Sequence, residues 1–399
     1  MVTPLNKIKV IDMSRILAGP WAGQLLGDYG ADVIKIEKPG IGDDTRQWGP
    51  PWLGDQSGYF MSTNRNKRSI TLNLSSTEGQ NIIKDLAKRS DILIENYKVG
   101  TLARYGISSE DLLKINPRLI YCSISAYGQS GSRSDQPGYD AMIQASAGLM
   151  SITGPEEDDS GGPQKVGVAI SDIMAGMYAV TAILAALNSR ERTGKGQAID
   201  IPLYDSQVAW LANQNMNYLL DKVSPKRMGT AHPNLVPYQV FSTSDGALML
   251  AVGNDNQFKK CCDALELDSL KEDPRFKNMS NRISNRKVLI KLLENKFITD
   301  NTKNWLKKLL DLKVPAGPVN DIKEVLTNEY ASERNLIKYI TNSEGQNVPN
   351  ISNPVNFDCT PVEYNLPPPL LGEHTHEILN EWLGYSDKKM NSLKKLGVI

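Results

Sequence analysis

Apolar and polar positions in the first 200 residues follow a repeating order. Short apolar runs with the length of strands alternate with longer stretches that have helical spacing. This alternation is typical of a largely parallel sheet covered by helices on both faces, so we predict an α/β fold. The pattern predicts strands over residues 7–13, 32–37, 91–95, 119–125 and 198–202, and helices over residues 20–29, 76–89 and 172–190.

The pattern changes after about residue 213, where lysine and asparagine become more frequent. An apolar run at residues 248–252 indicates a strand within an antiparallel hairpin. The end of the chain is expected to be irregular and then helical. Further helices are expected over residues 255–265, 285–297 and 301–312. We therefore predict a large domain over residues 1–224, a small α+β domain over 225–330 and a C-terminal segment over 331–399.

The predicted helix over residues 172–190 is almost wholly apolar, which indicates deep burial. One carboxylate, Asp172, stands at its first turn. The helix dipole there favours the ionised form by about 0.3–1 kcal/mol, so we expect a carboxylate at neutral pH. Ser171 or Asp172 could instead simply cap the helix, because both residue types are preferred N-caps.

Charge and cysteine content exclude several classes of function. The 45 basic and 45 acidic residues balance, so no strongly basic field is available to attract nucleic acid. The four cysteines have no zinc-binding spacing and suggest a reducing compartment. A strand pattern begins within a few residues of the N-terminus, and no apolar run approaches the ~20 residues of a membrane span. We therefore expect a cytoplasmic protein without membrane contact.

Common cofactor and metal motifs are missing from the sequence. The turn after the first predicted strand holds one glycine, so the GxGxxG fingerprint of dinucleotide-binding proteins is absent. There is no Walker A motif and no GxSxG elbow. His374 and His376 form a His-x-His pair with Glu373 as the only neighbouring candidate ligand, and the start of a surface helix explains them better. We predict no metal site.

Cationic and polar residues follow three of the predicted strands, at the edge where sheets of this kind bind ligands. Arg15 precedes a helix start and suits an anion or a salt bridge. Lys38 and Arg46 lie in a glycine-rich loop that either binds phosphate or carboxylate groups or is a solvated turn. Residues 95–97 with Arg104 form a third edge or a plain surface loop. Together these loops suggest a large, phosphate-bearing small molecule.

The same residues carry a family resemblance over essentially the whole chain. The sequence resembles the class III CoA-transferases, the superfamily of formyl-CoA transferases, carnitine CoA-transferases and 2-methylacyl-CoA racemases. So many blocks in the same order form a specific signal. The matching blocks are residues 17–20, 26–37, 66–70, 95–97, 138–140, 172–176, 194–197, 314–318 and 371–374.

The resemblance implies a Rossmann-like, CoA-binding large domain to which the C-terminal segment returns. It also implies an interlocked homodimer of ring-like subunits. The nucleophile of the family falls on Asp172, which would form an aspartyl–acyl anhydride and then an aspartyl–CoA thioester. CoA thioesters would be substrates, and no permanently bound cofactor is expected.

Family contacts to CoA transfer to this sequence by position. Arg15 joins them as a residue of the same loop, and Tyr139 falls at an active-site position beside them. The chain departs from the family where Ser75 replaces a basic residue and where residues 229–234 replace a run of glycines; Gly229 and His232 of that loop are assigned to the substrate. The predicted CoA contacts are Leu17, Ala18, Lys38, Leu72, Asn96, Tyr97, Lys98 and Arg104.

Several activities are consistent with the resemblance. Racemases of the superfamily have histidine where this chain has Tyr139, and a phenol ionises too far above neutral pH to serve as their base. A formyl-CoA:oxalate-type transferase or a catalytically silent acyl-CoA-binding protein would also fit the CoA loops. Residues 42–51, 227–232 and 236–239 are most similar to transferases that move CoA from succinyl-CoA to glutarate. Arg46 would then clamp the distal carboxylate of a dicarboxylate.

Overall fold

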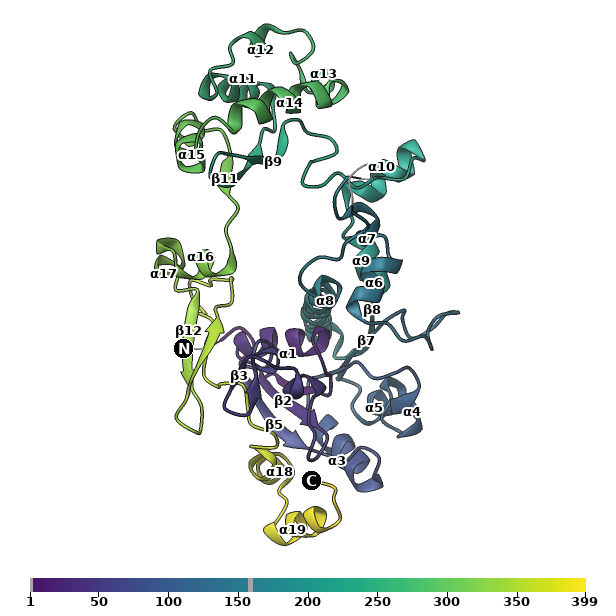
Figure 1. Ribbon diagram of the computed structural model, residues 1–399. Helices are drawn as coiled ribbons and strands as arrows, with labels where there is room; N and C mark the ends of the chain where they lie inside the picture. The colour runs from purple at the N-terminus through teal and green to yellow at the C-terminus, as the bar shows by residue number, and fades with distance from the viewer. Residues whose placement is uncertain (1–2, 157–160) are drawn as a thin grey trace. The chain divides into compact units, whose positions relative to one another are not determined.

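The computed structural model describes residues 3–156 and 161–399 (Figure 1). The chain divides into two compact units, which we call the large and the small unit. The large unit contains Met1–Leu149, Val166–Leu219 and Ser332–Ile399, and the small unit contains Met150–Lys165 and Leu220–Ala331.

A six-stranded parallel sheet forms the centre of the large unit, which confirms the predicted α/β class. The strand order is β5-β2-β1-β6-β7-β8, so β1 has β2 on one side and β6 on the other. A ligand crevice forms at such a point of reversal, outside the carboxyl ends of the strands. The strands are β1 Lys9–Asp12, β2 Asp32–Glu37, β5 Lys67–Thr71, β6 Ile92–Glu95, β7 Ile120–Ser125 and β8 Gln197–Pro202.

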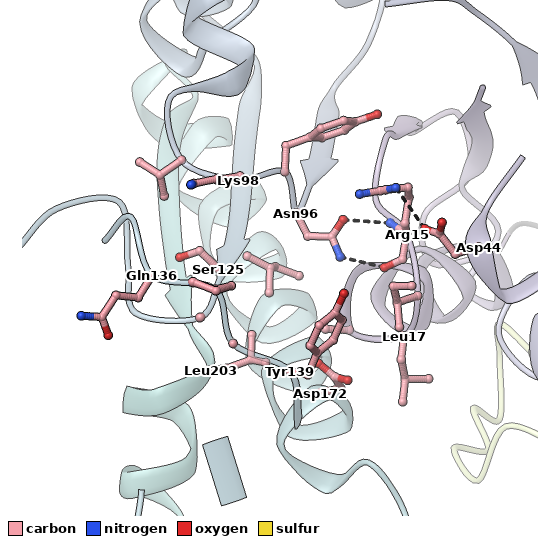
Figure 2. Close-up of a pocket in the computed structure, with 18 of the residues that line it drawn as sticks. Arg15, Leu17, Asp44, Asn96, Lys98, Ser125, Gln136, Tyr139, Asp172 and Leu203 are labelled. Atoms are coloured by element: carbon pink, nitrogen blue, oxygen red, sulfur yellow. Dashed lines mark hydrogen bonds and ion pairs between the residues drawn. The ribbon is translucent and has the colours of Figure 1, made fainter. Parts of the chain in front are cut away.

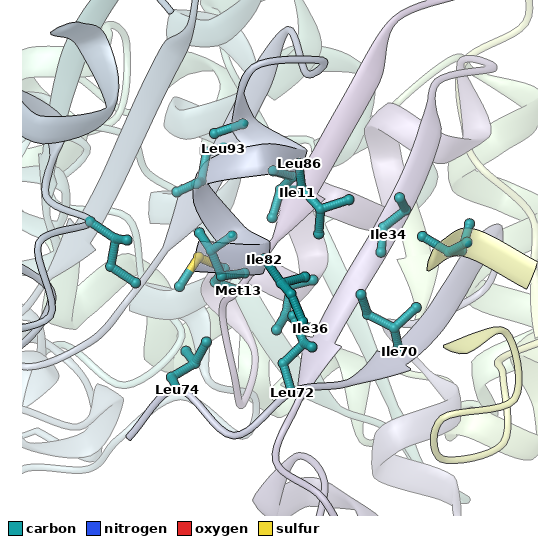
Figure 3. Close-up of a cluster of buried hydrophobic side chains, with 14 of the residues drawn as sticks. Ile11, Met13, Ile34, Ile36, Ile70, Leu72, Leu74, Ile82, Leu86 and Leu93 are labelled. Atoms are coloured by element: carbon teal, nitrogen blue, oxygen red, sulfur yellow. The ribbon is translucent and has the colours of Figure 1, made fainter. Parts of the chain in front are cut away.

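Helices cover both faces of this sheet. Successive strand residues point to opposite faces, so Val10 belongs to one apolar cluster and Ile11 to the other. Figure 3 shows the cluster that contains Ile11, in which Ile82 and Leu86 of α3 pack against the strands. The helices of this unit are α1 Ala18–Asp28, α2 Gly58–Met61, α3 Thr77–Ala87, α4 Thr101–Arg104, α5 Ser109–Ile115, α6 Asp140–Ser146, α8 Ile170–Thr193, α9 Leu203–Ala209, α18 Thr375–Leu383 and α19 Asp387–Lys395.

Helix α8 packs against α1, α6, α9 and the β7–β8 edge. Only one side of it is buried, so the expectation of deep burial is wrong for its other side. Met177, Tyr178 and Leu184 are exposed although they are apolar. By length and composition α8 could also cross a membrane, contrary to the expectation that no such run exists. A helix packed in a protein core passes the same test.

The chain returns to the large unit at its end. Helix α18 packs against the edge strand β5, as Figure 1 shows in yellow. Arg68 of β5 forms ion pairs with Glu377 at 2.6 Å and Glu381 at 2.8 Å. The remaining elements of this unit are the 3-10 helix η1 Asp44–Gln47 and the hairpin strands β3 Trp52–Leu53, β4 Gln56–Ser57, β12 Ile337–Thr341 and β13 Asn347–Ile351.

The small unit has its own apolar core, built by helices that pack on an antiparallel sheet. Phe241, Phe297 and Trp305 meet in this core, with ring centroids 4.8 and 5.6 Å apart. The predicted antiparallel hairpin is formed by β9 and β10. The elements are β9 Tyr238–Ser242, β10 Ala247–Ala251, β11 Ala316–Pro318, α11 Asp255–Ala264, α12 Ser269–Glu272, α13 Met279–Ser284, α14 Arg286–Phe297, α15 Thr302–Asp311 and α16 Ile322–Thr327. Helices α7 Leu149–Ile152, α10 Asn213–Asp221 and α17 Glu329–Glu333 lie where the chain passes between the units.

Candidate active site

A cavity of about 480 Å³ opens in the large unit, where the loops after β1, β6 and β7 meet. We call it the nucleophile cavity because Asp172 is among its lining residues (Figure 2). Eight residues that the sequence predicted for the site line this one cavity. They are Arg15, Leu17, Ala18, Asn96, Tyr97, Lys98, Tyr139 and Asp172.

Asp172 stands in the first turn of α8, as predicted, but it does not cap the helix. The N-cap is Ala169, which makes no side-chain capping bond. Ser171 does not cap either, because its hydroxyl donates to Gln207 Oε1 at 2.7 Å. Within the described part of the chain, no hydrogen bond to the Asp172 carboxylate is present, so its oxygens are available to a ligand.

Close packing between α1 and α8 brings Asp172 to the loop before α1. Gly176 lies one turn after Asp172, and a Cβ there would come within 2.6 Å of the Ala18 carbonyl oxygen. Any larger residue would therefore push the two helices apart. The Asp172–Gly176 spacing places the carboxylate on the same side of α8 as this contact.

The pKa of Asp172 is raised to about 7, first by burial and then by the charge of Asp140. These effects outweigh the helix dipole, so the expectation of a fully ionised carboxylate at neutral pH is wrong. A carboxyl group poised near neutral pH is typical of a catalytic site.

Asp140, the first residue of α6, is fixed beside α8 by two hydrogen bonds. Its Oδ1 accepts from the backbone N–H of Ser171 at 2.8 Å, and its Oδ2 accepts from Gln144 at 2.7 Å. A carboxylate thus satisfies one of the free N–H groups at the start of α8. Asp140 therefore supplies a fixed negative charge next to the residue that precedes Asp172.

The loop after β1 is held by side chains from three other segments. The N–H groups of Ser14 and Ile16 donate to Asp12 and Asp43, at 3.0 and 3.2 Å. Asn96 accepts from the N–H of Arg15 at 2.8 Å and donates to its carbonyl at 2.7 Å. Ile16 has a φ of +71°, a conformation that costs a β-branched residue of order 1–3 kcal/mol. These bonds hold the strained loop in place beside the cavity.

Buried ion pairs lie below this loop. Lys35 pairs with Asp43 at 2.9 Å and Lys67 with Asp12 at 2.8 Å, and all four side chains are fully buried. Burial would raise the pKa of Asp43, but the Lys35 ammonium and bonds from Lys35 and Thr45 lower it to about 2. Burial lowers the pKa of Lys67 to about 8 even though Asp12 opposes that effect.

A second cavity, of about 330 Å³, contains two more predicted contact residues, Lys38 and Leu72. We call it the Lys38 cavity. Ser75 also lines it, at the position where the family places a basic residue. Arg15, Asp44 and Tyr97 line both cavities and therefore form the boundary between them.

Arg46 makes contacts that differ from those expected of a substrate clamp. Its guanidinium donates to both carboxylate oxygens of Glu37, at 2.8 and 2.7 Å, and to the Pro369 carbonyl at 3.1 Å. It also lies 3.7 Å from the centre of the Phe60 ring. Arg46 is absent from the residues that line either cavity. Its donors are therefore engaged in holding the loop that follows β2.

Three other predicted residues, Arg104, Gly229 and His232, are not among the residues that line the two cavities. Arg104 is exposed at the end of α4 and bonds Thr101. Gly229 and His232 belong to the small unit, where the Gly229 N–H donates to the Gly154 carbonyl at 3.1 Å. The pKa of His232 is lowered by burial and by the charge of Arg286.

The structure adds residues that the sequence did not indicate. Burial, and after it the charges of Asp172, Asp140 and Asp43, raise the pKa of Tyr59 to about 12. Tyr59 packs edge-on against Trp48, a lining residue of the nucleophile cavity, with centroids 5.1 Å apart. No motif signals these two residues. Asp140 lies in a block that matches the family, and a carboxylate next to Tyr139 is its only signal.

The groupings of side chains among the described residues also bear on metal binding. In residues 3–156 and 161–399, no three His, Cys, Asp or Glu residues are grouped so as to hold a metal ion. His376 of the His-x-His pair bonds Asp387 at 2.8 Å instead.

Comparison with known proteins gives consistent matches over nearly the whole chain. The model of CoA-transferase family III matches residues 5–375. Human succinyl-CoA:glutarate CoA-transferase is 44% identical over all of this chain and 90% of its own length. Succinate–glutarate CoA-transferase of Agrobacterium fabrum is also 44% identical, over 95% of each chain. The crystal structure of a CAIB/BAIF family protein from Brucella suis matches with a TM-score of 0.84 at 44% identity and covers 96% of this chain and 100% of its own.

Proposed function

Because the chain belongs to CoA-transferase family III, it is an enzyme that acts on CoA thioesters, and we propose that it moves CoA from succinyl-CoA to glutarate. The observation that carries this proposal is the site itself. A half-buried carboxyl group without hydrogen bonds, Asp172, lines a cavity together with seven further residues that the sequence predicted for the site, five of them at family CoA positions. Relatives 43–44% identical, whose names combine succinyl-CoA or succinate with glutarate, support the choice of substrates.

Asp172 performs the chemistry as a nucleophile. A carboxylate oxygen attacks the thioester carbonyl of succinyl-CoA, the C–S bond breaks, and CoA leaves as a thiolate. The product is an anhydride between Asp172 and succinate. The thiolate then attacks the Asp172 carbonyl carbon, which releases succinate and leaves an Asp172–CoA thioester. Glutarate reverses these steps and leaves as glutaryl-CoA, so the reaction needs no net proton transfer.

The remaining cavity residues bind and orient CoA. Leu17 and Ala18 present the start of α1 to the thioester end, and Asn96 fixes that loop while lining the cavity. Lys38 and Lys98 are exposed cations that suit the phosphates. Arg104 is proposed as a CoA contact, and Gly229 and His232 as substrate contacts, on the family resemblance alone. Arg46 holds Glu37 and would have to leave it in order to clamp a substrate carboxylate.

We further propose that two chains assemble into the interlocked homodimer expected of this family. Met177, Tyr178 and Leu184 leave an apolar side of α8 exposed, and Tyr139 of the cavity is 68% exposed in a single chain. A second chain that covers these groups would also keep water from the anhydride. Sedimentation velocity should give twice the mass of one chain, and a monomer at micromolar concentration contradicts this assembly.

The proposed compartment is the cytoplasm. Cys122, Cys261, Cys262 and Cys359 are free, which fits a reducing environment. Cell fractionation tests this proposal, and an exclusive location in another compartment rejects it.

The activity is tested with succinyl-CoA and a panel of acceptor acids, with chromatography of the CoA esters as the readout. We expect glutarate to rank first in kcat/KM, ahead of monocarboxylates of similar length and of oxalate. Formation of glutaryl-CoA must equal loss of succinyl-CoA. Exchange of the α-proton of an acyl-CoA in heavy water without any acceptor would support a racemase instead.

The acid limb of the pH profile is expected to follow Asp172. Only the ionised carboxylate attacks, so kcat/KM should rise with pH through about 7 and level off above it. Asp140→Asn removes the negative charge that helps to raise the pKa of Asp172, so its limb should move to lower pH. Asp135→Asn, which removes an exposed charge from the preceding loop, is the control. If the acid limb of the kcat/KM profile of Asp140→Asn has the same midpoint pH as that of the wild type, the titrating group is not Asp172.

A further inference from the structure

Arg15 and Asp44 meet at the boundary between the nucleophile cavity and the Lys38 cavity. Their ion pair joins Arg15 Nη1 and Asp44 Oδ2 at 3.0 Å, and Figure 2 shows the guanidinium beside the carboxylate. Tyr97, the third residue shared by the cavities, lies with its ring centre 5.6 Å from the guanidinium carbon. The pair therefore lies at the boundary where the two cavities share lining residues.

The backbones on both sides of this pair are fixed, and only the side chains are free to move. Asn96 bonds both the N–H and the carbonyl of Arg15. Asp44 begins η1, whose N-cap Asp43 accepts from Thr45 N and is held by Lys35. Both side chains of the pair are 46% exposed, in contrast to the fully buried pair between Lys35 and Asp43 directly beneath. An exposed pair of this kind is weak and opens easily.

A bound CoA thioester must pass this boundary if its thioester reaches Asp172 while its adenosine end lies near Lys38 and Leu72. The middle of the molecule carries the pyrophosphate, which a carboxylate repels and a guanidinium binds by paired charge-assisted hydrogen bonds. Asp44 and the pyrophosphate therefore compete for the same cation.

We propose that Asp44 is a positioning residue that holds Arg15 across the boundary in the free enzyme and is displaced from it by the CoA pyrophosphate. The proposal rests on the proposed function, because it requires CoA to occupy both cavities. Asp44 keeps Arg15 extended at the boundary before the ligand arrives. Because Asp44 competes with the pyrophosphate for Arg15, it lowers the affinity for CoA. Release of the product ester is easier for the same reason, since Arg15 re-forms its ion pair with Asp44.

The test measures the affinity for free CoA by isothermal titration calorimetry in the full-length protein. Asp44→Asn should bind CoA about two- to fivefold more tightly than the wild type, since an exposed ion pair no longer has to break. Asp44→Ser, with a shorter side chain, should show the same gain. Asp55→Asn, which removes an exposed carboxylate from the neighbouring β3–β4 turn, should bind as the wild type does. Thermal unfolding followed by circular dichroism checks that each variant is folded.

A double-mutant cycle separates competition for Arg15 from simple charge repulsion. Arg15→Gln should weaken CoA binding, and adding Asp44→Asn to it should give no more than a small gain. An equal gain in the presence and absence of Arg15 overturns the proposal, because repulsion alone would then explain it. Unchanged or weaker binding by Asp44→Asn overturns it as well. A wild type that binds no CoA rejects the proposed function, whereas the other outcomes leave that function intact.

Discussion

Asp172→Ala is expected to lower kcat for CoA transfer by about 10³-fold or more, because the group that forms both covalent intermediates is lost. Asp172→Asn keeps the size of the side chain and should lose activity to the same degree. Asp205→Asn is the matched control, since Asp205 is an exposed carboxylate in the first turn of α9 and lies outside the nucleophile cavity. Initial rates of glutaryl-CoA formation measure all three variants.

An oxygen label tests the same residue without a mutation. When glutarate labelled with ¹⁸O accepts CoA, one labelled oxygen stays on Asp172 after the thiolate attacks the glutaryl carbonyl. Either oxygen of the regenerated carboxylate can attack the next succinyl-CoA, so the label leaves in the succinate of that turnover or of a later one. Mass spectrometry should therefore find one ¹⁸O in the succinate that accumulates over many turnovers. Unlabelled succinate, or more than about a tenth of wild-type activity in Asp172→Asn, contradicts covalent catalysis by this residue.

Asp43→Asn is expected to lower the free energy of unfolding by about 3–5 kcal/mol, because it leaves Lys35 as a buried charge without its closest partner. Asp44→Asn is the control one residue away, since it breaks only the exposed pair with Arg15 and should cost at most about 1 kcal/mol. Urea unfolding at neutral pH measures both variants. If the two substitutions lower the free energy of unfolding equally, the buried pair contributes no more to stability than the exposed pair does.

The pH dependence of this stability has a definite direction. The pKa of Asp43 is lowered to about 2 in the folded protein, below its value in the unfolded chain. Its contribution is therefore complete above about pH 4 and is lost as the pH falls from there through about 2. The difference in stability between wild type and Asp43→Asn should shrink over that range and stay constant between pH 5 and 7.

Much of the large unit follows from its apolar runs. The strand predicted over residues 32–37 has the same bounds in the structure. Strands β6 and β7 each begin one residue later than predicted and end where predicted. Strand β5 was missed because its sequence starts with Lys67 and Arg68, which do not read as a buried strand. Their charges are neutralised by Asp12 and by the carboxylates around Arg68, all distant in sequence.

The position of Asp172 could be predicted, but its chemical environment could not. The helix start and the family pattern both point to that residue. Its raised pKa depends on burial and on the charge of Asp140. Asp140 is held there by a hydrogen bond from the backbone N–H of Ser171, which is 31 residues away in the sequence. In the same way, nothing local indicates that residues 150–165 join the small unit. The predicted domain limits and the roles of the individual contact residues stay predictions.

The end of the polypeptide has a consequence for the order in which the molecule can form. The Asn73 N–H donates to the Val398 carbonyl at 2.7 Å, and Asn66 N–H donates to the Leu366 carbonyl at 2.8 Å. Strand β5 and the residues that flank it are thus covered in part by residues that leave the ribosome more than 290 positions later. During synthesis this sheet edge therefore stays uncovered until the residues that contact it have been made, and an uncovered strand edge can pair with other chains.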